Sequence, residues 1–304
     1  MSTDPMKDPK PKVVRRLIRP FEVTDGRHFK LKDVDPRDHG EIASREAADR
    51  WLGFGLERLA DLQDKLYARS TWSALLVFQA MDAAGKDSTI KHVMSGVNPQ
   101  GCQVFSFKAP SEEDLRHDFL WRCARCLPER GRIGIFNRSY YEEVLVVRVH
   151  DELLERQSIP AALVTKDIWK ERFEDIRCFE RHLHRNGTVV LKFFLHVSKK
   201  EQRKRFLERL EKPEKNWKFS SRDLEERKLW SDYQSAYENM IQHTATPDAP
   251  WYVVPADHKW FTRLVVAAAI VHALDGLDLK RPPLDPAEQR ALEAGRAALR
   301  RKDA

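Results

Sequence analysis

The sequence predicts an α/β fold in which helices cover both faces of one parallel sheet, a three-layer α/β/α arrangement. Short apolar runs alternate along the chain with longer segments of helical periodicity, as they do in chains built from βαβ units. The runs are too short to be buried helices and are bounded by turn residues, which is typical of strands buried on both faces. The five strands predicted in this way are residues 74–78, 103–107, 132–136, 188–197 and 251–254.

The helices are predicted in the segments around these strands. An apolar period of three to four residues predicts a long helix over residues 41–69, before the first strand. Ser111 and Asp114 have the spacing of a capping box and predict one helix over residues 111–127. Further helices are predicted over residues 89–95, from 139 onward, and over 165–185, 198–212, 221–243 and 260–274.

Composition divides the chain into three parts. Residues 1–40 are polar and rich in proline and basic residues, so we expect an N-terminal basic arm on the surface. Residues 41–275 hold every predicted strand, and this length is enough for one domain with an ample core. Residues 276–304 form a charged C-terminal tail.

The charge of the chain points to an anionic partner. Its net charge is +7 and its pI is near 9.2, which favours a nucleotide, a polyanion, a nucleic acid or a membrane surface. The longest apolar run, residues 264–274, is too short to span a bilayer, and residues 1–20 lack the apolar core of a secretory signal. Four cysteines form no disulfide framework in a chain of this size. We therefore expect reduced thiols and a cytoplasmic location.

A candidate phosphate-binding loop follows the first predicted strand. In a Walker A loop, G-x-x-x-x-G-K-[S/T], backbone N–H groups hold phosphate oxygens and the lysine reaches the β and γ phosphates. Gly85 and Lys86 keep this pattern, whereas Ala80 replaces its first glycine. An ordinary turn with a solvated lysine is the alternative. The loop residues expected to bind phosphate are Ala83, Ala84, Gly85, Asp87 and Ser88.

Two carboxylates in this loop predict a metal ion. Asp82 and Asp87 would repel a phosphate unless a cation lay between them and it, and Mg²⁺ bridges carboxylates and phosphates in this way. Asp87 or Ser88 takes the place of the hydroxyl residue that usually binds the metal.

A second polar cluster follows the strand at residues 132–136. Asn137 lies where P-loop kinases usually carry an acidic residue, and its amide oxygen can coordinate a metal or its water. Arg138 and Glu142 are four residues apart, so they share one helix face from which both can point into a cleft. A structural alternative stays open, because Ser139 and Glu142 also have capping-box spacing and Arg138 and Glu142 could form an ordinary ion pair. The candidate metal ligands are thus Asp82, Asn137 and Glu142.

A basic segment follows the most apolar strand. Residues 198–219 carry nine Lys or Arg against four acidic residues, at the position where P-loop kinases place a lid that closes over the phosphates. We predict a helical lid over about residues 198–222, with Arg205 and Arg209 directed at the ligand. The segment is longer than a mononucleotide requires, which indicates an extended polyanion. A solvated surface face is the alternative.

Four motifs, in this order along the chain, resemble the polyphosphate kinase 2 family. They are residues 80–87 (AMDAAGKD), 107–110 (FKAP), 136–144 (FNRSYYEEV) and 216–220 (NWKFS). The resemblance covers about residues 40–275 and implies a thymidylate-kinase-like P-loop kinase fold with a helical lid. It also implies Mg²⁺-dependent transfer of phosphoryl groups between inorganic polyphosphate and nucleotides. The third motif is similar to that of the class III subgroup, which implies that both AMP and ADP are phosphorylated, giving ADP and ATP.

The resemblance implies roles for single residues as well. Asp82 is then the metal-linked carboxylate that activates the acceptor, while Lys86 and Arg138 neutralise the transferred phosphoryl group. Asn137 departs from the aspartate of the wider family. The other contacts that the resemblance implies are Lys108 and Arg122 in the cleft and Arg205 and Arg209 in the lid.

Two further functions are compatible with the charge and the loop. The first is an ATP-dependent nucleotide or small-metabolite kinase, which the long basic segment and Asp82 argue against. The second is a nucleic-acid-binding P-loop protein, for which the sequence offers no recognition motif and no basic stripe interleaved with aromatic residues. We therefore expect no nucleic-acid partner and no membrane partner. The resemblance implies a homo-oligomer, either a dimer or a tetramer.

Overall fold

The computed structural model describes residues 10–300, and its centre is a six-stranded sheet in the order β1-β6-β5-β2-β4-β3. The strands are β1 (Glu22–Val23), β2 (Ser73–Gln79), β3 (Cys102–Ser106), β4 (Ile133–Asn137), β5 (Thr188–His196) and β6 (Trp251–Pro255). Strands β2 to β6 are parallel, whereas β1 pairs antiparallel with β6. The α/β class and the five predicted strands are confirmed, but the predicted strand count of five is wrong by one.

The sixth strand lies in the segment for which the sequence predicts a surface arm. A two-residue strand is too short for hydrophobic periodicity to reveal it. The residues before it show that this segment packs onto the core. Ile18 is fully buried, and the ring of Phe21 meets that of Phe261 edge-on at 5.6 Å. The hydroxyl of Tyr252 donates to Glu22 Oε1 at 2.9 Å, which fastens β1 to β6. The first nine residues of the predicted arm lie outside the described residues.

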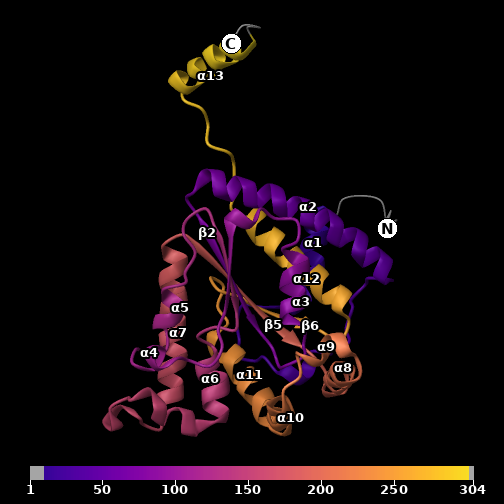
Figure 1. The fold of residues 1–304 in the computed structure, drawn as a ribbon, viewed down its shortest axis with the longest axis vertical. Helices are drawn as coiled ribbons and strands as arrows, with labels where there is room; N and C mark the ends of the chain where they lie inside the picture. The colour runs from indigo at the N-terminus through magenta and orange to yellow at the C-terminus, as the bar shows by residue number, and fades with distance from the viewer. Residues whose placement is uncertain (1–9, 301–304) are drawn as a thin grey trace.

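Helices cover both faces of the sheet, as the three-layer prediction requires (Figure 1). One layer is formed by α1 (Pro11–Ile18), α2 (Arg45–Arg69), α3 (Lys86–Val93) and α12 (Lys259–Asp275). The other contains α6 (Glu142–Val149), α7 (Ile168–Arg185) and α11 (Trp230–Thr244). Helix α12 is apolar along most of its length because it is buried between the sheet and α2.

The helix predicted over residues 111–127 is wrong in its length. The capping box at its start is present, since Ser111 Oγ accepts from the backbone N–H of Asp114 at 3.1 Å. The helix nevertheless breaks into α4 (Glu112–Leu115) and α5 (Trp121–Ala124). Between them Asp118 accepts from the backbone N–H of Leu120 at 2.9 Å, and a local bond of this kind competes with helix continuation.

The predicted lid is a group of three helices beyond β5. They are α8 (Lys199–Glu211), α9 (Pro213–Asn216) and α10 (Ser221–Lys228). The segment predicted as one helix over 221–243 is therefore two helices, α10 and α11. The remaining helix, α13 (Pro286–Arg300), stands away from the body of the molecule and is exposed throughout (Figure 1). None of the described helices combines the length and the apolarity that crossing a membrane requires.

The register of the central strands determines where the motifs meet. Strand β2 lies between β4 and β5, with Phe78 opposite Asn137 of β4 and Gln79 opposite Phe194 of β5. The loop after β2 and the polar turn after β4 therefore leave the same edge of the sheet side by side, which is where open α/β sheets bind their ligands.

We predict that Ile18→Ala lowers the free energy of unfolding by about 2–5 kcal/mol, because it leaves a cavity under the N-terminal segment. Urea unfolding followed by tryptophan fluorescence measures this change. Arg16→Ala is the matched control on the same helix, since Arg16 is 62% exposed and pairs only with a surface glutamate. A loss for Ile18→Ala as small as that of the control would show that residues 11–23 are not part of the core.

Candidate active site at the carboxyl ends of the strands

A cavity of about 940 Å³ opens at the carboxyl ends of β2, β3 and β4, beneath the lid helices. The loop after β2 forms its floor, and the turn after β4 forms one wall. The sequence-predicted site residues all line this cavity: Asp82, Ala83, Ala84, Gly85, Lys86, Asp87, Ser88, Lys108, Arg122, Asn137, Arg138, Glu142, Arg205 and Arg209. The structure thus brings them together, and their contacts differ from one residue to the next.

The phosphate loop has the backbone that its sequence suggests. Gly85 has a φ of 110°, in the left-handed region that favours glycine, and is the N-cap of α3. Ala83 also has a positive φ, 61°, so the loop turns sharply before the helix starts. Lys86 is the first residue of α3, and its Nζ donates to the backbone oxygen of Ala80 at 2.8 Å. Burial, together with nearby Arg138, lowers the pKa of Lys86, so an anion in the cavity would stabilise its charged form.

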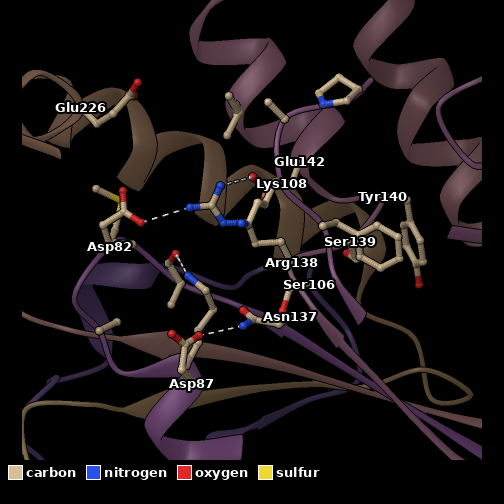
Figure 2. A pocket seen from close by; sticks show the side chains of 18 of the residues that line it. Asp82, Asp87, Ser106, Lys108, Asn137, Arg138, Ser139, Tyr140, Glu142 and Glu226 are labelled. Carbon is tan, nitrogen blue, oxygen red and sulfur yellow. Dashed lines mark hydrogen bonds and ion pairs between the residues drawn. The ribbon is translucent and has the colours of Figure 1, made fainter. Parts of the chain in front are cut away.

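Arg138 lies between two carboxylates at the centre of the site (Figure 2). Its Nη2 donates to Asp82 Oδ1 at 3.2 Å, and its Nη1 lies 3.7 Å from Glu142 Oε2. Glu142 is the main reason why the pKa of Arg138 is raised. Burial raises the pKa of the Glu142 carboxyl, against the opposing effect of Arg138. The site therefore holds a guanidinium in fixed orientation between the ends of β2 and β4.

The capping alternative for Glu142 is wrong. Helix α6 begins at Glu142 itself, and Ser139 Oγ accepts from the backbone N–H of Tyr141 at 3.1 Å. The carboxylate instead pairs with Arg138 and accepts from the Gln79 amide at 2.9 Å, with that amide oriented to accept from Ser139. Glu142 is thus directed into the cavity by a buried contact that sequence spacing did not reveal.

Asn137 and Asp87 form the second polar pair of the site. The Asn137 amide nitrogen donates to Asp87 Oδ1 at 2.7 Å, so the amide orients the carboxylate (Figure 2). Asp82 and Asp87 offer carboxylate oxygens on the phosphate loop, and Mg²⁺ takes one or two such ligands alongside phosphate oxygens and water. In residues 10–300 no three acidic, histidine or cysteine side chains converge into a metal cage. Asp82 and Glu142 both pair with Arg138, and the metal roles predicted for Asp82, Asn137 and Glu142 stay predictions.

Arg205 does not point at a ligand, which corrects the predicted lid contact. Its side chain is only 5% exposed, and all its donors are used within the protein. They go, at 2.6–3.1 Å, to the Glu201 carboxylate and to the backbone oxygens of Ala83, Ala84, Ala256 and Asp257. Arg205 therefore braces the phosphate loop against the end of β6. The spacing of the basic residues gave the correct helix face but could not distinguish a phosphate from a backbone carbonyl.

Arg209 joins the helices of the lid. Its Nη1 donates to the Lys218 backbone oxygen at 3.2 Å and to Asp223 Oδ2 at 2.9 Å. On the other side of the cavity Arg122 donates to the Lys108 backbone oxygen at 2.8 Å and lies over the Phe107 ring at 5.6 Å. Lys108 itself is exposed at the cavity.

Several cations of the cavity were not singled out from the sequence. Lys215, Lys218 and Arg222 of the lid line it, as does Lys259 at the start of α12. The first two belong to the basic run, where one-dimensional spacing gives no reason to prefer them. Lys259 lies far outside that run, and burial lowers its pKa.

We predict that Arg205→Gln lowers the free energy of unfolding by about 1–3 kcal/mol, because it leaves buried carbonyl oxygens without donors. Lys204→Gln is the control, since Lys204 is the adjacent residue and is 66% exposed. Chemical denaturation of the two variants measures the difference. Equal stability would mean that the Arg205 guanidinium is free to bind a ligand after all.

Comparison with known proteins identifies the family and the fold. The family model for polyphosphate kinase 2 (PPK2) matches residues 43–282. The chain is 52% identical to an ADP-polyphosphate phosphotransferase of Rhodopseudomonas palustris, over 90% of this chain and 94% of that protein. It is 46% identical to an AMP/ADP-polyphosphate phosphotransferase of Meiothermus ruber, over 88% of this chain and 96% of that protein. The crystal structure of polyphosphate kinase 2 from Arthrobacter aurescens TC1 is similar with a TM-score of 0.83 and 38% identity, over 95% of this chain and 99% of that chain.

The motifs, the sheet and the cavity therefore agree with the resemblance seen in the sequence. The P-loop kinase fold is confirmed with six strands rather than five. The chain belongs to the polyphosphate kinase 2 family.

Proposed function

We propose that the chain transfers the terminal phosphoryl group of inorganic polyphosphate to AMP and to ADP, giving ADP and ATP, with Mg²⁺ as the metal. The observation that carries this proposal is one cavity lined both by a phosphate loop and by a lid rich in lysine and arginine. Relatives that cover nearly the same length are named for ADP in one case and for AMP and ADP in another, which supports both acceptors.

The residues of the site act by positioning and by neutralising charge. Lys86 and Arg138 are held by neighbouring oxygens before any ligand arrives, so they face the transferring phosphoryl group without rearrangement. Asp82 orients Arg138, and its proposed role is to activate the acceptor, as the family resemblance suggests. When bound, Mg²⁺ would neutralise phosphate oxygens, and Asp82 and Asp87 are the residues that would hold it, with Asn137 fixing the orientation of Asp87.

The lid supports a polyanion as the phosphoryl donor. Lys215, Lys218 and Arg222 extend the positive charge of the cavity beyond the phosphate loop, in the direction of the lid. A donor with many phosphates can occupy this extension, whereas the phosphates of a nucleotide need only the loop. We also propose a cytoplasmic location and a homo-oligomer, a dimer or tetramer, as the family resemblance suggests.

The experiment that tests this function is incubation of the purified protein with polyphosphate, AMP and Mg²⁺ in the absence of ATP. Formation of ADP, and then of ATP, followed by anion-exchange chromatography, is the expected result. An ATP-dependent kinase or a nucleic-acid-binding protein would form neither product, and that outcome would overturn the proposal.

We predict that Lys86→Ala lowers turnover by at least about a hundredfold, the scale of losing one preorganised charge stabiliser. Asp82→Asn should have a comparable effect, because it releases Arg138 and removes a carboxylate from the loop. Both residues line an open cavity, so the melting temperatures should change little. Steady-state rates with ADP measure the effect, and near-normal turnover in either variant would contradict the assignment of the site.

A further prediction concerns the salt dependence of polyphosphate binding. Replacing Lys215 and Lys218 with Gln should flatten the slope of log Kd against log salt by about 0.7–0.9 for each lost phosphate contact. The control replaces Lys204 and Lys212 with Gln, the same charge change in the same lid at positions that do not line the cavity. Equal slopes in the two double variants would mean that the lid acts only as a diffuse positive surface.

A further inference from the structure

A buried polar network lies behind the turn that carries Arg138 and Glu142. The hydroxyls of Tyr140 and Tyr141 donate to Glu180 Oε1 at 2.9 and 2.7 Å. Lys192 Nζ donates to Glu180 Oε2 at 2.7 Å, to the Tyr141 hydroxyl at 3.1 Å and to the Thr244 backbone oxygen at 2.7 Å. Lys192 is 0% and Glu180 1% exposed, so this ion pair lies in the core of the protein.

A buried ion pair is a poor means of stabilising a fold. Both charges lose their hydration, and apolar side chains of similar volume often stabilise a core as well or better. The pair instead fixes the positions of the groups that hydrogen-bond to it. Burial and Glu180 raise the pKa of both tyrosines far above the usual range, so their hydroxyls keep the protons that they donate. The carboxylate thereby fixes two consecutive residues at one point.

The same helix holds the turn at a second point. Glu143 accepts from Arg172 Nε at 3.1 Å and from Gln157 Nε2 at 2.7 Å. Arg172 and Glu180 both belong to α7 and are eight residues apart, which is close to two helical turns, so they lie on one side of that helix. Helix α7 therefore hydrogen-bonds to the residue before Glu142, Tyr141, and to the residue after it, Glu143.

The turn between β4 and α6 needs such support. Arg138 has a φ of 65°, in the left-handed region that non-glycine residues rarely occupy, and such a conformation persists only where surrounding contacts determine it. Its backbone N–H donates to the Phe78 backbone oxygen at 3.0 Å, which fixes the side toward β2. On the other side the Gln79 amide holds Ser139, and Glu180 holds the next two residues, Tyr140 and Tyr141, so the backbone position of Arg138 depends in part on these two tyrosines. Figure 2 shows Ser139 and Tyr140 beside Arg138.

We propose that Glu180, neutralised by Lys192, is a positioning residue for phosphoryl transfer. It holds Arg138 at the cavity through the hydroxyls of Tyr140 and Tyr141. This inference rests on the proposed role of Arg138 in neutralising the transferred group. It assigns a function to two residues of the FNRSYYEEV motif whose hydroxyls bond to a buried glutamate, and it distinguishes positioning from a contribution to stability alone.

The test compares Tyr141→Phe and Glu180→Gln with Tyr252→Phe. Tyr252 also donates a hydroxyl to a glutamate at 2.9 Å, but at the β1 edge of the sheet, so the control loses the same kind of bond. We expect kcat to fall by about ten- to a hundredfold in the first two variants, the scale of a displaced catalytic group. The KM for polyphosphate should stay within about twofold, since the lid is untouched, and the control should keep its kcat.

Combining Tyr141→Phe with Arg138→Ala decides whether the tyrosine acts through the arginine. The inference predicts that the double variant is no slower than Arg138→Ala alone, because the group being positioned is already absent. Additive losses would overturn it, as would wild-type kcat in both Tyr141→Phe and Glu180→Gln while Arg138→Ala is impaired. Full activity in Arg138→Ala would instead overturn the proposed role of Arg138. If Glu180→Gln fails to fold, Tyr141→Phe decides alone, because it keeps the Lys192–Glu180 pair.

Discussion

The constraint on which the site depends is the balance of charge at the ends of β2 and β4. Lys86 and Arg138 face three carboxylates, those of Asp82, Asp87 and Glu142, around a cavity that must admit phosphates. Two cations against three anions leave this cluster with one net negative charge. The lysines and arginines of the lid make the rest of the cavity positive and attract a polyanion. Beside the three carboxylates, however, a phosphate is stabilised by a divalent cation that enters with it, so the carboxylates of the loop and the predicted Mg²⁺ belong to one explanation.

Such a cluster works only if its members cannot move, and the fold supplies a separate support for each half. Arg205 binds the backbone oxygens of the phosphate loop and of the end of β6, so the loop cannot move independently of the sheet. Helix α7 supports the turn after β4 through Glu180 and Arg172. Glu180 is buried behind the turn, whereas Arg205 lines the cavity but directs its donors to backbone oxygens. The other cations of the lid remain available for the polyanion.

The fold and the site could be predicted from the sequence where local chemistry determines the structure. Gly85 and Lys86 between an apolar run and a helix located the loop, and alternating segments gave the order of strands and helices. The sequence-based prediction missed β1, because two residues are too few to show hydrophobic alternation. It also predicted one helix over residues 111–127, where Asp118 accepts a backbone hydrogen bond that competes with the helix. Most partners of Arg205 could not be predicted, because they are backbone oxygens of two segments far apart in the sequence, residues 83–84 and 256–257.

The most apolar strand carries one sign of a buried ion pair. Lys192 is a single charge in the middle of the most apolar strand, and a lysine there must have a buried partner. That partner, Glu180, lies on an amphipathic helix among many exposed charges, and nothing local marks it. Arg138 and Glu142 were predicted as a pair from their spacing. The capping alternative could be decided only in the structure, where Ser139 accepts from the Tyr141 N–H and Gln79, distant in the sequence, lies beside Glu142.

The measurement that tests this account most directly is the affinity for polyphosphate, by titration calorimetry, in Mg²⁺ and in EDTA at equal ionic strength. The charge balance predicts binding at least about tenfold tighter with Mg²⁺, the scale of one charge pair at a partly exposed site. It also predicts that Asp82→Asn combined with Asp87→Asn removes most of this difference. Mg²⁺ that merely screened the polyanion would weaken binding instead, so equal or weaker affinity with Mg²⁺ would contradict the account.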